Sequence, residues 1–208
     1  MAFGGYDMKT RILASFLLLS ICAPAAIATQ AGHIVAWGVN EDGQTQAPAG
    51  DDFVAIAAGE AHGLALRANG SIVGWGWDYF GQATPPSGTG FIAVAAGCYH
   101  SLALRTDGSI VGWGNNYSNN GQWLGQATPP SGTGYKAIGA GYQHSVALRA
   151  DGSIVAWGDN KYGQATAPSG TGYVAVAAGI DHCLALKSDG KIVGWGRNTD
   201  YDDNFVWQ

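Results

Sequence analysis

The strongest constraint on the fold is a heptapeptide that recurs along the chain at a nearly constant spacing. It reads GSIVGWG at residues 70–76 and 108–114 and recurs, with one or two changes, at residues 32–38, 152–158 and 190–196. Successive copies begin 38, 38, 44 and 38 residues apart, and the longer interval contains a six-residue insertion around residues 119–124. A fixed period of this length predicts a repeat architecture, in which each unit buries its apolar surface on its neighbours.

Each unit is predicted to contain four short strands, which in one copy cover residues 91–96, 101–105, 109–113 and about 126–128. Asp107-Gly108 joins the second strand to the third, and Asp-Gly or Asn-Gly stands there in the other units. These dipeptides favour a two-residue hairpin in which both central residues have a positive φ. The sheets are therefore expected to be antiparallel, which excludes a parallel β-helix.

Both faces of these strands are apolar. Alternation along a strand predicts that Ile92 and Val94 share one face, and that Trp113 points away from Ile110. Sheets of this kind can stack radially on copies of themselves, which indicates an all-β fold, a β-propeller of four-stranded blades. One tryptophan of each heptapeptide is expected in the core between blades: Trp37, Trp75, Trp113, Trp157 and Trp195.

The repeat resembles that of the regulator of chromosome condensation family. The resemblance rests on GCYHSLALRTDG at residues 97–108, on VGWG at 111–114 and on a later Gly-Gln, and it extends over residues 32–196. It implies a propeller, usually of seven blades. The short period and the N-terminal segment look most like secreted bacterial members, one of which is a propeller-type β-lactamase inhibitory protein. Nucleotide exchange, the role of the nuclear member, is not implied for this acidic chain.

The number of copies is smaller than a seven-bladed ring needs. We expect four to five units, at about residues 32–69, 70–107, 108–151 and 152–189, with a partial one at 190–208. The array is then an incomplete relative of the ring. It is an open arc, a ring completed by self-association or the product of a truncated reading frame.

Residues 1–28 have the pattern of a signal peptide. MKTR, beginning at Met8 (a candidate for the true start), precedes an apolar run that ends in small residues, so cleavage is expected after Ala28. The alternative is a retained membrane anchor. After cleavage, residues 29–208 form a single repeat domain that is secreted, periplasmic or extracellular and has no membrane contact. Cys98 and Cys183 are expected to be buried free thiols.

Charge and motifs exclude several functions. The net charge is −5 and the ten Lys and Arg residues form no cluster, so no nucleic-acid partner is expected. No recognised catalytic motif is present, so we predict a protein that is not an enzyme and needs no cofactor or metal. The neighbours His182 and Cys183 point to opposite faces of a strand and do not form a catalytic pair. Four histidines recur in step and are interpreted as structural, bonded to the backbone of the adjacent blade: His62, His100, His144 and His182.

Function is expected on one rim of the propeller. The loops between the first two strands of each blade and after the third strand vary between copies, whereas those of the opposite rim barely do. The candidate partner-binding residues of the variable rim are Trp77, Tyr79, Phe80, Tyr99, Tyr117, Trp123, Tyr142 and Tyr162.

Aromatic side chains of this kind dominate protein interfaces. They favour binding of another extracytoplasmic protein, with an inhibitor-like role as one form of it. Several alternatives remain at this stage. The aromatic residues are turn residues that pack on neighbouring loops, or the chain is a carbohydrate-binding surface protein, a glycan-acting enzyme or a truncated propeller fragment without independent function.

Overall fold

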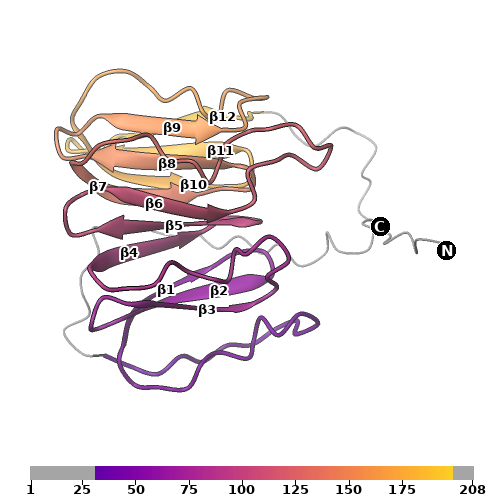
Figure 1. Cartoon of the computed structure of the whole chain (residues 1–208). Coiled ribbons are helices and arrows are strands. Elements are labelled where there is room, and N and C mark those ends of the chain that lie inside the picture. The colour runs from indigo at the N-terminus through magenta and orange to yellow at the C-terminus, as the bar shows by residue number, and fades with distance from the viewer. Residues whose placement is uncertain (1–30, 199–208) are drawn as a thin grey trace.

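The computed structural model describes residues 31–198, which contain twelve β-strands in four antiparallel sheets stacked one on the next (Figure 1). The sheets are β1(Phe53–Ala58), β2(His62–Arg67) and β3(Ile72–Gly76); β4(Phe91–Ala96), β5(His100–Arg105) and β6(Ile110–Gly114); β7(Tyr135–Ala140), β8(His144–Arg149) and β9(Ile154–Gly158); and β10(Tyr173–Ala178), β11(His182–Lys187) and β12(Ile192–Gly196). The described residues form no helix that is long and apolar enough to span a membrane. The predicted signal segment, residues 1–28, lies outside the described residues.

Each sheet is one blade, and each blade packs on the next along the chain. Strands β1, β4, β7 and β10 contact one another in sequence and form one edge of the stack. The first and last blades lie at opposite ends of it (Figure 1). The prediction of an all-β, incomplete propeller is therefore confirmed, and residues 31–198 form an open stack of four blades.

The fourth strand predicted for each blade is not formed. After β3, the backbone amide of Ala83 donates a hydrogen bond to the Asp78 carboxylate (2.6 Å). The carbonyl of Gln82 accepts hydrogen bonds from the side chains of Ser101 and Trp113, both at 2.9 Å. Because these backbone groups are bonded to side chains, they do not form a β-ladder, and each blade has three strands.

The turn between the second and third strands also differs from the prediction. Gly108 N donates to the Arg105 carbonyl and Arg105 N donates to the Ser109 carbonyl, both at 2.9 Å, so the loop has three residues. Gly108 has a φ of 78°, and no other residue type in the range 31–198 has a positive φ. Three-residue hairpin loops end in a left-handed residue that glycine suits best. The glycine is thus needed, but the aspartate before it does not adopt a positive φ.

A β-bulge at the start of each blade changes which side chains share a face. In β4 the register shifts between Phe91 and Ala93. Because a bulge adds one residue to one strand, it breaks the alternation of faces. Val94 packs toward the first blade, whereas Ile92 packs toward the third. The prediction that these two residues share a face is therefore wrong.

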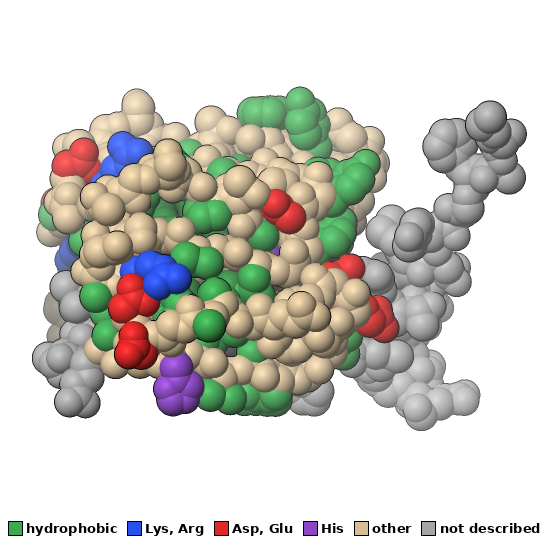
Figure 2. Space-filling view, turned by 60° about the horizontal axis from the view of Figure 1, so that its bottom comes forward, with side chains coloured by type: hydrophobic (Ala, Val, Ile, Leu, Met, Phe, Trp, Pro, Cys, Tyr) green, Lys and Arg blue, Asp and Glu red, His purple; other side chains and the backbone are tan. Residues whose placement is uncertain are grey.

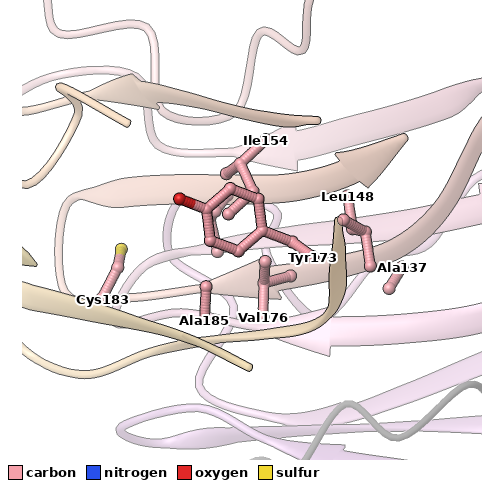
Figure 3. Packing of buried hydrophobic residues seen from close by; sticks show 8 residues of the cluster. Ala137, Leu148, Ile154, Tyr173, Val176, Cys183 and Ala185 are labelled. Atoms are coloured by element: carbon pink, nitrogen blue, oxygen red, sulfur yellow. The ribbon is translucent and has the colours of Figure 1, made fainter. Parts of the chain in front are cut away.

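The core lies between the blades. Between the third and fourth blades, Leu148 and Ile154 pack against Val176, Cys183 and Ala185 (Figure 3). Burial of a leucine or isoleucine side chain contributes about 1.5–3 kcal/mol. Equivalent clusters join the first blade to the second and the second to the third. A single three-stranded sheet has no such core, so each blade depends on its neighbour.

Four of the five repeated tryptophans are half-buried: Trp113, Trp157 and Trp195 lie between blades, as predicted, whereas Trp75 lies in the first blade and belongs to no cluster between blades. Each donates its indole N–H to the backbone carbonyl of a glutamine 31 residues earlier, at 2.9–3.0 Å: Trp75 to Gln44, Trp113 to Gln82, Trp157 to Gln126 and Trp195 to Gln164. The fifth, Trp37, is 84% exposed, so its predicted place in the core is wrong. Apart from a single bridge at Gly32, its segment pairs with no strand of the described chain.

The repeated histidines connect neighbouring blades. His62 Nε2 lies 2.9 Å from the Ser101 hydroxyl of the next blade, and this hydroxyl donates to the Gln82 carbonyl. The same contact joins His100 to Ser145 at 2.9 Å and His144 to the Cys183 thiol at 3.1 Å. His182 has no following blade to contact within residues 31–198, but His62, His100 and His144 are structural, as predicted. Their partner is a side chain of the adjacent blade rather than its backbone.

Replacing Ser145 with alanine should destabilise the protein by about 1–3 kcal/mol, because it leaves the buried His100 Nε2 without a partner. Ser145→Cys is the matched control, since Cys183 fills the equivalent position and still contacts a histidine. Urea unfolding followed by tryptophan fluorescence measures both. Equal midpoints for the wild type and Ser145→Ala would contradict the role of this contact.

Burial also predicts how stability depends on pH. It lowers the pKa of His62 and His144 to about 4 and that of His100 to about 3. In the unfolded chain these imidazoles titrate near ~6.5, so below that pH the unfolded state binds protons that the folded state does not. Stability is therefore complete above pH ~6.5 and decreases toward pH ~4, by about 1.4 kcal/mol per pH unit for each histidine.

Urea midpoints measured between pH ~6.5 and ~4.5 test this dependence. His100→Gln removes one titrating group, so its slope should be shallower than that of the wild type. A wild-type stability that stays constant over this range would refute the argument.

Both ends of the stack expose side chains whose counterparts are buried inside it. Ile56 in the first blade is 65% exposed, whereas its counterpart Val176 in the last blade is 2% exposed. At the other end Ile192 is 70% exposed, and its counterpart Ile110 is 8% exposed. Figure 2 turns the first-blade end forward and shows hydrophobic side chains at the surface among few charged ones. Both end faces therefore have the character of a blade interior.

Candidate functional site

The variable loops lie on one rim and are bonded together there. The first residue after β3, Trp77, donates its backbone N–H to the Ala61 carbonyl in the β1–β2 loop (2.8 Å). The same bond recurs in the later blades from Asn115 to Tyr99, from Asp159 to Gln143 and from Arg197 to Asp181. Each blade thus presents its two variable loops side by side.

Five of the eight predicted rim residues form one continuous cluster, here called the aromatic ridge: Trp77, Tyr79, Phe80, Tyr99 and Tyr142. Trp77 stacks on Tyr79, with centroids 6.0 Å apart, and meets Tyr99 of the second blade edge to face at 5.0 Å. Phe80 lies 5.7 Å from Tyr99, and Tyr142 of the third blade lies 6.4 Å from it. Tyr79 is 78% exposed. The ridge therefore crosses three blades with part of its surface open to solvent.

The other three candidates lie outside the ridge. Tyr117 and Trp123 pair with each other at 5.1 Å on the six-residue insertion. Tyr162 packs beneath two cations, with Lys161 4.9 Å and Arg197 4.6 Å from its ring centroid. The eight residues thus form three groups, a division that the repeat pattern does not reveal.

A contact between a buried thiol and an exposed carboxylate lies next to the ridge. The Cys98 thiol donates a hydrogen bond to the Glu60 carboxylate of the first blade. Burial and the charge of Glu60 raise the pKa of Cys98, and burial raises the pKa of Tyr142 to about 12. Burial also raises the pKa of Tyr99. The thiol and both phenols therefore stay protonated at neutral pH. Cys98 and Cys183 are both buried and free, as predicted.

The loop between the first and second strands of each blade begins with a glycine, and a close approach between blades explains it. A Cβ atom on Gly97 would lie 2.3 Å from His100 Cε1 and 2.5 Å from the Gly141 carbonyl oxygen of the next blade. Atoms that are not bonded to each other do not approach a Cβ atom this closely, so a residue larger than glycine would displace the loop. The glycine therefore places Cys98 and Tyr99 directly against the third blade.

Side-chain bonds hold the loops that carry the ridge, and the sequence reasoning missed them. Asp78 accepts the Ala83 backbone N–H at 2.6 Å, and the Gln82 side-chain oxygen accepts that of Phe80 at 3.0 Å. The other units have Asn at the position of Asp78, and the same bond is made by Asn40, Asn116 and Asn160. An Asp or Asn recurs two places after each Trp-Gly, and this recurrence in the sequence indicates that the residue belongs to the scaffold. These residues lie in loops that otherwise vary.

Removal of the Asp78 carboxylate should loosen the ridge. In Asp78→Ala, the Ala83 amide loses its acceptor, and its hydrogen exchange should become about tenfold faster or more, the equivalent of about 1.4 kcal/mol. Asp78→Asn is the matched control, because Asn makes this bond in three other units. Exchange measured by NMR at pH 7 would speak against this role if the wild type and Asp78→Ala were alike.

The described residues offer little reactive chemistry. Within residues 31–198, no three His, Cys, Asp or Glu side chains lie close enough together to hold a metal ion. His144 contacts the Cys183 thiol, but burial raises the pKa of Cys183 to about 12 and lowers that of His144 to about 4. The pair is therefore a neutral thiol and a neutral imidazole rather than an activated nucleophile.

The blades and the repeated inter-blade bonds define a propeller built from one repeat type. Four segments of the chain match the family model of the regulator of chromosome condensation (RCC1) repeat, at residues 53–82, 91–122, 135–164 and 173–201. Each segment begins at the first strand of a blade. Because the matches cover more than half of the sequence, the chain belongs to the RCC1 repeat family.

Solved propellers have the same fold. Prp20p from Saccharomyces cerevisiae, whose structure was described with its binding properties to Gsp1p and histones, is 20% identical with a TM-score of 0.70, over 85% of this chain and 56% of that one. Human WBSCR16 is 20% identical with a TM-score of 0.58, over 80% of this chain and 54% of that one.

The ectodomain of the Arabidopsis thaliana receptor kinase ACR4 is 23% identical with a TM-score of 0.56, over 72% of this chain and 52% of that one. The chain thus spans about half the length of these relatives, and identities this low establish the fold alone. A comparison with curated proteins finds no match. Propellers of this family are generally binding or exchange-factor folds that mediate protein interactions.

Proposed function

We propose that this chain is a secreted, non-catalytic binding protein whose aromatic ridge contacts another extracytoplasmic protein. The observation that carries the proposal is the contact between five aromatic side chains from three blades, with Tyr79 78% exposed. Tyrosine and tryptophan are the residues most enriched at interface hot spots, because they contribute a large contact area and lose little side-chain entropy.

The charge and order of the ridge support the same function. The aromatic side chains of the ridge are uncharged at neutral pH, and the exposed carboxylate of Glu60 beside them is bonded to the buried Cys98 thiol. The centres of protein interfaces are depleted in charged residues in the same way. Asp78 and Gln82 hold the loops in place, so little ordering is needed when a partner binds.

The absence of catalysis is part of the proposal. The thiol that lies against the ridge in the described part of the chain, Cys98, is buried and has a raised pKa. A thiol in this state is a poor nucleophile. The ridge therefore serves as a contact surface rather than as a reactive centre.

Secretion and an inhibitor-like role are the more specific parts of the proposal. Secretion rests on the signal pattern of residues 1–28. If the full chain is produced in a bacterial host, the exported protein should begin at Thr29, as measured by mass spectrometry of the periplasmic and medium fractions. A full-length protein confined to the cytoplasm would contradict secretion.

Ridge variants test the binding function. Immobilised chain should capture a partner from the extracytoplasmic fraction of its own cells, and a purified β-lactamase serves as a second, defined probe for inhibition. Trp77→Ala combined with Tyr79→Ala should weaken capture about 30-fold or more, equivalent to about 2 kcal/mol for a hot spot. Tyr162→Ala, outside the ridge, is the matched control. Capture that is unchanged in the double variant would exclude the ridge as the binding surface.

A further inference from the structure

A second candidate site lies beside the aromatic ridge, in a groove of about 720 Å³ between two loops of adjacent blades. One wall is the insertion after β6, with Gln122 and Trp123, and the other is the loop after β9, with Asp159 and Lys161. Gln143 of the third blade also lines the groove. Its volume falls within the range of about 300–1,000 Å³ that small-molecule sites occupy.

The wall formed by the insertion is a built structure that the propeller itself does not require. The other units lack these six residues and still form blades. The backbone N–H of Ser118 donates to the Gln122 carbonyl at 2.8 Å, and the Ser118 hydroxyl accepts the backbone N–H of Gln122 at 2.9 Å. Tyr117 and Trp123 form a β-bridge, and their rings pack edge to face at 5.1 Å. The insertion therefore presents its side chains from an ordered hairpin.

The groove offers an aromatic face and hydrogen-bonding groups that the fold does not use. Trp123 is 55% exposed, and no residue in the range 31–198 bonds to its indole N–H or to the side-chain amide of Gln122. Gln143 donates to Asn119 at 3.2 Å, which leaves its side-chain oxygen directed to no described partner. These groups provide one flat apolar surface together with both donors and acceptors.

This combination suits a neutral, hydroxyl-rich ligand. An anion would need several cations, but Lys161 is the only one among the lining residues and it lies beside Asp159. Only Trp123 and Leu124 among the lining residues have apolar side chains, whereas five lining residues carry side-chain amides, so the groove differs from the aromatic ridge. Amides can donate to and accept from adjacent hydroxyls, and an indole face can pack on the C–H groups of a sugar ring.

We propose that this groove binds a neutral oligosaccharide, with one sugar ring stacked on Trp123 and its hydroxyls bonded to the side chains of Gln122 and Gln143. The site is distinct from the aromatic ridge, although Asn119 joins the two by donating to the Tyr142 hydroxyl at 3.4 Å. It does not depend on the ridge binding a protein. Protein and sugar can therefore occupy neighbouring parts of the same rim.

Isothermal titration calorimetry of the full chain tests the proposal, with maltotetraose, cellotetraose and the tetramer of N-acetylglucosamine as probes. At least one should bind with a dissociation constant of about 1 mM or tighter. Trp123→Ala should weaken that binding about tenfold or more, because the stacking surface is lost. Trp77→Ala is the matched control, since this tryptophan belongs to the ridge, and its affinity for the sugar should equal that of the wild type.

Gln122→Ala provides a second test in case Trp123→Ala unfolds, because the exposed Gln122 side chain makes no bond to the described fold. It should weaken binding about threefold or more. Failure of all three sugars to bind, or equal affinities for the wild type and the groove variants, would overturn the proposal. If the ridge variants lose protein capture but still bind the sugar, the sugar site in the groove is supported, because it is independent of protein binding at the ridge.

Discussion

The contact between successive blades is the interaction on which the rest of this structure depends. A three-stranded sheet has two apolar faces and no core of its own, so its leucines and isoleucines are buried only against the next blade. Several polar groups inside that contact are also paired between blades. A histidine of one blade meets a hydroxyl or thiol of the next, and the carbonyl of the connecting glutamine accepts from both that group and a tryptophan indole. Burial keeps the histidines neutral, which makes the contact sensitive to acid.

The same contacts determine the geometry of the variable rim. The backbone carbonyl of Gln82 accepts a hydrogen bond from Trp113 of the next blade. The side-chain oxygen of the same glutamine accepts the backbone N–H of Phe80 in the loop of its own blade. Scaffold and site are therefore connected through one residue. Asp78 closes the same loop, and Gly97 allows the second blade to approach the third closely. A rigid frame with a few unconstrained positions can vary its surface residues without altering its blades, which suits recognition of different ligands.

Much of this architecture could be predicted from the repeat, including the antiparallel strands, the place of the inner tryptophans and the structural role of the histidines. Errors arose where local pattern and local bonding disagree. The bulge at Phe91 places Ile92 and Val94 on opposite faces, which simple alternation along the strand does not predict. The predicted fourth strand is not formed, because the side chains of Asp78, Ser101 and Trp113 form hydrogen bonds with the backbone groups that a β-ladder would need. Such bonds come from residues distant in sequence, and no local propensity reports them.

By itself, the sequence determined the repeat period, the antiparallel blade and the resemblance to a propeller family. The reason is that near-identical units with apolar faces bury those faces by stacking on one another. The sequence also indicated which rim varies. Only the tertiary structure decided that Trp77, Tyr99 and Tyr142 meet in one ridge while Trp123 faces a separate groove. The distance between loops of different blades depends on how closely the blades pack. That packing is set by side-chain contacts across the interface rather than by the order of residues along the chain.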